Sequence, residues 1–133
     1  MRTRTYMPAH PVAPAPLALV TVDPIAAEQA VSILRQAADA AHLERERQQR
    51  ALAHATEAWL GKERARAERD AASLQQGWLD LEVDLRRAAT LTRLAVDDAL
   101  HENHRRQTAY DDALAEYREA RAALARTEAM SGG

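Results

Sequence analysis

Aspartate and histidine stand three residues apart at two places in the chain, as Asp39-x-x-His42 and Asp98-x-x-His101. In a helix this spacing puts the carboxylate and the imidazole on one face, and paired motifs of this kind build dinuclear metal sites in helical bundles. In a helical hairpin, however, these two motifs would lie far apart, and no pair of inward-facing glutamates accompanies them. Solvated histidines near helix ends explain both motifs better.

A second arrangement pairs His101 with His104, and Asp97 or Asp98 could supply a third ligand to one metal ion. The sequence offers no fourth ligand and no group that would orient the imidazoles, as metal sites require. A metal-binding helical bundle centred on His101 and His104 therefore stays an alternative hypothesis. We expect no metal and no cofactor.

Most carboxylates lie three or four residues from an arginine, as in Glu63-x-x-Arg66 and Asp84-x-x-Arg87. This spacing stabilises exposed helix faces through solvated ion pairs, whereas acid–base catalysis requires shifted pKa values in a dry pocket. The chain contains no cysteine, and it has neither a glycine-rich phosphate loop nor a nucleophile motif. We therefore predict that the protein is not an enzyme.

The 18 basic and 20 acidic residues are interleaved and leave a net charge of −2. Such a balance provides no basic surface for nucleic acid. No apolar run reaches the roughly 18 residues that a membrane-spanning helix needs. The apolar N-terminal stretch is interrupted by Pro11, Pro14 and Pro16, which disfavours a cleaved signal peptide. These features predict a cytoplasmic protein, with secretion without a cleaved signal as the alternative.

The chain is rich in helix-forming residues, with 31 alanines and no phenylalanine among 133 residues. All five prolines lie in the first 24 residues, so residues 1–23 are predicted to form a flexible, extended tail. Asp23 can cap a helix that begins at Pro24. We predict an all-α fold in which an antiparallel hairpin of helices 24–60 and 62–102 is joined by a third helix, 108–129, in a small bundle or coiled coil. Residues 130–133 are expected to be disordered.

Apolar residues alternate at spacings of three and four on both sides of Gly61, which is typical of paired helices. In the first helix Arg45 and Gln48 interrupt the apolar seam. The first seam comprises Ala27, Val31, Leu34, Ala38, Ala41, Leu52, Ala55 and Trp59. The second seam comprises Ala67, Ala71, Leu74, Trp78, Leu81, Leu85, Ala88, Thr92, Ala95 and Ala99.

A hairpin that turns at Gly61 places His42 opposite Asp80 and Trp78 opposite Glu44, since both helices rise equally per residue. The polar run "HENHRRQT", residues 101–108, then interrupts the apolar pattern, and Thr108 with Asp111 resembles a helix start. These observations support the boundary between the second and third helices.

A second apolar stripe on the 62–102 helix predicts a further packing partner, which would be the third helix or another chain. Large aromatic side chains are over-represented at interface hot spots. We therefore predict a protein–protein interaction module (a structural subunit, adaptor or assembly factor) that binds itself or another protein. The predicted contact residues are Trp59, Trp78, Leu79, Val83, Leu91, Leu94, Tyr110 and Tyr117.

Trp59-Leu60-Gly61, between two seamed helices, resembles the Trp-x-Gly motif of the small helical-hairpin substrates of type VII secretion systems. The resemblance covers about residues 24–100. It implies an α-helical hairpin that is exported as a homo- or heterodimer without a cleaved signal peptide.

Overall fold

The computed structural model describes residues 10–132 as two α-helices, α1 (Pro24–Ala55) and α2 (Lys62–Ser131). The all-α class is confirmed. The prediction of a third helix is wrong, because α2 runs without a break through residues 101–107 and on to Ser131. Parts of the predicted tail and of the predicted disordered end, residues 1–9 and Gly133, lie outside the described residues.

Residues 101–107 continue α2, and the run contains no glycine or proline, the two residues least favourable inside a helix. The side chains of this run make contacts between successive turns. Glu102 pairs with Arg105 and with Arg106, and Gln107 donates a hydrogen bond to Asp111 at 2.9 Å. Such contacts stabilise a helix locally without an apolar partner. The loss of apolar periodicity therefore marks a change of neighbour, and the helix itself continues.

Side-chain capping sets the start of α1, and a threonine directly follows its end. Asp23 accepts hydrogen bonds at 3.1 Å from the backbone N–H groups of Ile25 and Ala26, at the Pro24 start. At the other end Thr56, which is buried, donates from its hydroxyl to the carbonyl of Leu52 at 2.8 Å. The first helix ends at Ala55, several residues before the predicted boundary at 60.

Gly61 immediately precedes α2 and has a φ of 71°. This left-handed conformation is accessible to glycine without the steric cost that a Cβ atom imposes. Trp59 and Leu60 lie in the connection between the two helices, where the backbone N–H of Trp59 donates to Thr56 at 3.0 Å. The Trp-x-Gly tripeptide thus coincides with the bend of the chain.

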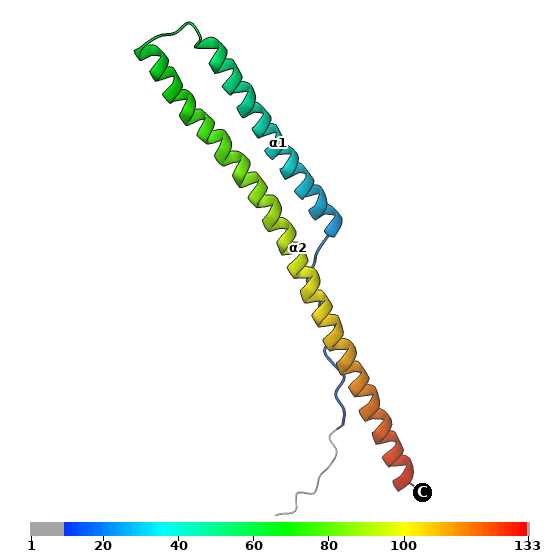
Figure 1. Ribbon diagram of the computed structural model, residues 1–133. Coiled ribbons are helices and arrows are strands. Elements are labelled where there is room, and N and C mark those ends of the chain that lie inside the picture. Colours follow the sequence, from blue (N-terminus) through cyan, green and yellow to red (C-terminus); the bar gives the residue numbers. More distant parts are fainter. Residues whose placement is uncertain (1–9, 133) are drawn as a thin grey trace, which may run out of the picture. The chain divides into compact units, whose positions relative to one another are not determined.

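The chain divides into two structural units. One unit comprises residues 22–98, in which α1 packs antiparallel to the first part of α2 (Figure 1). Its buried apolar residues are Val31, Ala38, Ala41 and Ala89. Three of these four are alanines, so the helices are held by close approach more than by bulky side chains.

The other unit combines the described residues 10–21 with residues 99–132. Here the N-terminal segment is extended and runs beside α2 (Figure 1). Asn103 and Arg106 on α2 hydrogen-bond to the backbone of this segment at Val20 and Ala18. The described part of the proline-rich stretch therefore has a definite neighbour on the helix.

Candidate protein interaction site

A layer of polar side chains lies between α1 and α2 in the middle of the hairpin. Trp78 donates from Nε1 to the Gln48 side-chain oxygen at 2.9 Å, and Gln75 donates to the backbone carbonyl of Arg45 at 3.3 Å. Arg45 also lies 3.7 Å from a carboxylate oxygen of Glu82. Arg45 and Gln48, which interrupt the apolar seam of α1, are therefore met by polar partners across the hairpin.

Glu82 is the most enclosed carboxylate of this layer, with its side chain 12% exposed. Burial by itself raises the pKa of Glu82. Hydrogen bonds from His42, at 3.3 Å, and from Arg86, together with the charges of His42 and Arg45, outweigh burial and hold this pKa below its ordinary value. The Glu82 carboxylate is thus kept ionised by the basic groups around it.

Two buried atoms of the polar layer, Arg45 Nε and Gln75 Oε1, have no hydrogen-bond partner within the described structure. An unpaired buried polar atom is destabilising, so this layer contributes less to stability than an apolar layer of equal size would. We interpret the polar layer as a feature that determines which residues of α1 lie opposite which residues of α2.

The polar layer explains why the seam of α2 differs from its predicted composition. The predicted seam includes Leu74 and Leu81, but these side chains are 56% and 44% exposed. Gln75 and Glu82 take their places against α1. Leucines opposite Arg45 and Gln48 would leave buried polar groups without partners, which costs more than exposing two leucines to water.

The observed seam of α2 runs with spacings of four and three, and its residues are buried or half-buried. It comprises Ala71, Gln75, Trp78, Glu82, Leu85, Ala89, Thr92 and Val96. The pairing of residues across the hairpin also differs from the predicted register. His42 contacts Glu82 instead of Asp80, and Trp78 contacts Gln48 instead of Glu44.

One edge of the hairpin is closed by ion pairs between the helices. Arg86 contacts Asp39 at 2.9 Å, and Arg93 donates to both carboxylate oxygens of Glu28 at 3.0 Å. Hydrogen bonds to Asp39 and Glu82 raise the pKa of Arg86 above its usual value. Both arginines directly follow a seam residue, so they lie on the same edge of α2.

The opposite edge carries an apolar surface, which we term the open flank. Leu74, Leu81, Ala88 and Ala95 each directly precede a seam residue, which places them across the seam from the arginines. Leu91 and Ile33 extend this surface and are 55% and 65% exposed. The open flank comprises Leu74, Leu81, Ala88, Leu91 and Ala95 on α2 with Ala30, Ile33, Ala37 and Ala40 on α1.

Two shallow hollows adjoin the open flank near the bend of the hairpin. One extends across both helices from Ala51 and Ala55 to Leu74, and the other lies along α2 between Leu74 and Leu81. Leu74 lines both hollows. This part of the hairpin therefore presents an uneven apolar surface into which side chains of another helix could pack.

The predicted contact residues do not form a single surface. Leu91 lies on the open flank, while Val83 and Leu94, which are 54% and 52% exposed, lie elsewhere on α2. Trp59, in the interhelix connection, is 45% exposed. Trp78 and Leu79 are half-buried in the hairpin.

Tyr110 and Tyr117 belong to the other structural unit, and both are half-buried. Tyr110 lines a hollow beside the N-terminal segment, and the Tyr117 hydroxyl accepts a hydrogen bond from Arg121 at 3.4 Å.

The predicted contact residues do not include Leu74 and Leu81, because the apolar periodicity placed these two leucines in the seam of α2. The signal that could have found them is the polar pair Arg45 and Gln48, which demands polar partners opposite.

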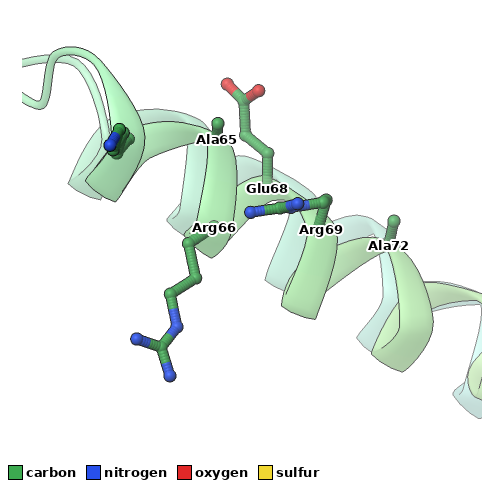
Figure 2. A pocket seen from close by; sticks show the side chains of 6 residues that line it. Ala65, Arg66, Glu68, Arg69 and Ala72 are labelled. Atoms are coloured by element: carbon green, nitrogen blue, oxygen red, sulfur yellow. The ribbon is translucent and has the colours of Figure 1, made fainter.

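A larger hollow at the start of α2 has none of the features of a binding site. It is lined by Lys62, Ala65, Arg66, Glu68, Arg69 and Ala72. Figure 2 shows that Arg66 and Glu68 point in opposite directions. Glu68 accepts a hydrogen bond from Arg64 at 3.0 Å, one turn earlier. All of the lining residues come from one helix, so no set of side chains converges on a ligand.

The histidines also fail to converge. His42 lies in the hairpin between Glu46, at 3.1 Å, and Glu82, whereas His101 and His104 belong to the other unit. Across residues 10–132 no group of three or more histidine, cysteine, aspartate or glutamate side chains is placed to hold a metal ion. Neither helix contains a stretch long and apolar enough to cross a membrane.

Comparisons with known proteins place the chain in no family. No protein-family model, no curated protein and no solved structure matches it. Functional inference therefore rests on the chain's own residues and contacts.

Proposed function

We propose that this protein is a non-catalytic helical module that acts through protein–protein contacts, and that the open flank is its docking surface. The observation that carries the proposal is the exposure of Leu74, Leu81, Leu91 and Ile33 along one edge of the hairpin. The other edge is closed by the Arg86–Asp39 and Arg93–Glu28 ion pairs. An apolar surface of this kind gains stability when another chain removes it from water.

A second copy of the chain is the occupant that fits this surface best. Alanines contribute more than half of the open flank, and small side chains let two helices approach closely. The nine residues of the flank are uncharged, while Asp84 on α2 and the paired Glu44 and Arg47 on α1 lie between them on the same edge. Pairing of identical surfaces around a two-fold axis is the commonest form of oligomer.

The test is the oligomeric state of the purified full-length chain, measured by light scattering coupled to size-exclusion chromatography. Leu81→Glu puts a charge on the open flank, and we expect it to weaken the association of two copies, measured as a lower apparent mass than that of wild type at the same concentration. Val83→Glu is the matched control, because Val83 is similarly exposed but lies off the flank. A wild-type chain that stays monomeric at high micromolar concentration would overturn the choice of a second copy. Circular dichroism checks that both variants stay helical.

A secreted hairpin of the type VII kind is a second candidate function. It is favoured by the position of Trp59-Leu60-Gly61 at the bend, where Leu60 is 84% exposed. The family's export signal, Tyr-x-x-x-Asp/Glu, is not met in this chain, because Leu114 follows Tyr110 by four residues and Arg121 follows Tyr117 by four. The candidate predicts release into the culture medium that depends on the secretion ATPase. Retention of the protein inside the cells would count against it.

A further inference from the structure

The N-terminal segment is held on α2 through its backbone. The side chain of Asn103 accepts a hydrogen bond from the N–H of Val20 at 2.7 Å and donates one to the carbonyl of the same residue at 3.0 Å. This pair of bonds is the one that a neighbouring β-strand makes with a residue of an extended chain. Arg106 donates a further hydrogen bond to the carbonyl of Ala18 at 3.0 Å.

An apolar hollow completes the site. Its helix side is formed by Arg106, Ala109, Tyr110 and Ala113, and its segment side by residues 14–18. Asn103, Arg106, Tyr110 and Ala113 are spaced by three and four residues, so they form one stripe along α2. We term this stripe the segment site. Pro14 and Pro16 lack a backbone N–H and favour the extended conformation in which the segment lies.

Few contacts bind the N-terminal segment to the segment site. Among the described residues 10–21, Val20 and Ala18 hydrogen-bond to Asn103 and Arg106 of α2, while Leu19 remains 48% exposed and Val12 87% exposed. These contacts oppose the conformational entropy lost when an extended stretch is ordered. The same segment of another copy offers identical contacts, so the site can accept that segment in place of its own.

The division of the chain gives this release a consequence. Residues 10–21 belong to the unit of residues 99–132, while the residues that directly follow them belong to the hairpin. An element that packs on one unit and is covalently continuous with another is the kind of element that copies of a protein exchange. We propose that residues 14–20 of one copy occupy the segment site of a second copy, so that exchange of this segment joins two chains. The inference is independent of the open flank.

Two variants of the full-length chain separate the segment from its site. Leu17→Asp keeps the site and prevents the segment from entering the apolar hollow. Asn103→Ala with Arg106→Ala keeps the segment and removes all three hydrogen bonds. Neither variant can dock its own segment, but a mixture of the two contains one intact segment and one intact site. Pro16→Glu is a second segment variant, and circular dichroism checks that each variant is helical.

Energy transfer between chains measures the exchange. The chain has no cysteine, so Val12→Cys on the site variant and Glu116→Cys on the segment variant each accept one dye. We expect the crossed mixture to associate about tenfold more tightly than either variant with itself, because only the crossed pair combines the hydrogen bonds to Asn103 and Arg106 with Leu17 in the hollow. Association through the open flank contributes equally to all mixtures and cancels in this comparison.

A doubly labelled wild-type chain, diluted with unlabelled chain, is the reference for docking within one molecule. Transfer within this chain combined with no excess transfer in the crossed mixture would show that the segment docks only on its own α2, and would overturn the proposal. Absence of transfer in the reference chain would overturn the segment site itself. Excess transfer in the crossed mixture that disappears on addition of unlabelled peptide of residues 11–21 supports exchange.

Discussion

The two structural units use the same helix, α2, against different kinds of neighbour. In residues 22–98 the neighbour is another helix, so side chains interdigitate along a seam and polar groups meet polar groups across it. In the other unit the neighbour is an extended segment whose backbone is free, and α2 supplies Asn103 and Arg106 to bond with it. The comparison shows how a change of side chains along one continuous helix changes the kind of chain it can bind.

The hairpin should be the more sensitive region to added volume. Ala38 is 0% exposed, and Ala38→Leu would force α1 and α2 apart, with an expected loss of about 1–3 kcal/mol in the free energy of unfolding. Ala53→Leu, at an exposed position of α1 that lies off the open flank, is the control and should change stability little. Urea unfolding followed by circular dichroism measures both. Equal effects of the two variants would mean that close helix approach does not hold the hairpin.

The polar layer should be less sensitive than the alanine contacts. Gln48→Ala removes the acceptor of the Trp78 indole N–H and should cost about 1 kcal/mol, because a half-buried donor is left unpaired. Gln49→Ala, at an exposed position, is the control. Trp78 fluorescence, measured in a Trp59→Phe background because the chain has a second tryptophan, reports the loss, since the Trp78 indole becomes more accessible to a quencher. Unchanged quenching would show that the bond to Gln48 does not position the tryptophan.

Acid should affect the hairpin more than the other structural unit, which comprises the described residues 10–21 and residues 99–132. The folded-state pKa of Glu82 is below its ordinary value, so the ionised form stabilises the fold at neutral pH, and this contribution is lost as the pH falls below 4.5 and through the folded-state pKa. Glu82→Gln should therefore flatten the acid side of the stability profile. Thermal melts between pH 7 and pH 3, at about one-unit steps, measure it. A profile parallel to wild type would contradict the assignment.

Glu102 is the carboxylate of the other structural unit whose pKa can be compared with that of Glu82. A hydrogen bond from Arg106 lowers the pKa of Glu102, burial opposes this, and the charges of Arg105 and Arg106 lower it further. The sign of its pH dependence is therefore the same as for Glu82. Its side chain is 31% exposed, compared with 12% for Glu82, so solvent screens its ion pairs more strongly. Glu102→Gln should have a smaller effect than Glu82→Gln in the same melts.

The smallest effect on global stability is expected from Asn103→Ala. Alanine is a strong helix former, so α2 is retained while both hydrogen bonds to Val20 are lost. The thermal midpoint should stay near that of wild type, while the amide of Val20 exchanges with deuterium about tenfold faster. Gln107→Ala, on the same part of α2, is the control. A large drop in midpoint would mean that segment and hairpin unfold together.

Much of the fold follows from residues that act locally. Asp23 and Pro24 mark the start of α1, and the abundance of alanine, arginine, glutamate and leucine determines the all-α class. The error at residues 101–107 arose because a lost apolar pattern was interpreted as a lost helix. Contacts such as Gln107 with Asp111 maintain a helix whether or not an apolar neighbour is present.

The sequence by itself determined that two helical stretches flank a bend near Gly61, because capping, propensity and proline placement operate within a few residues. Only the tertiary structure decided which face of α2 meets α1. Apolar periodicity favoured Leu74 and Leu81, but Gln75 donates to the Arg45 carbonyl and Glu82 pairs with the Arg45 side chain, so Gln75 and Glu82 lie in the seam. That choice depends on groups some 30 to 40 residues apart, and it leaves the leucines exposed on the open flank.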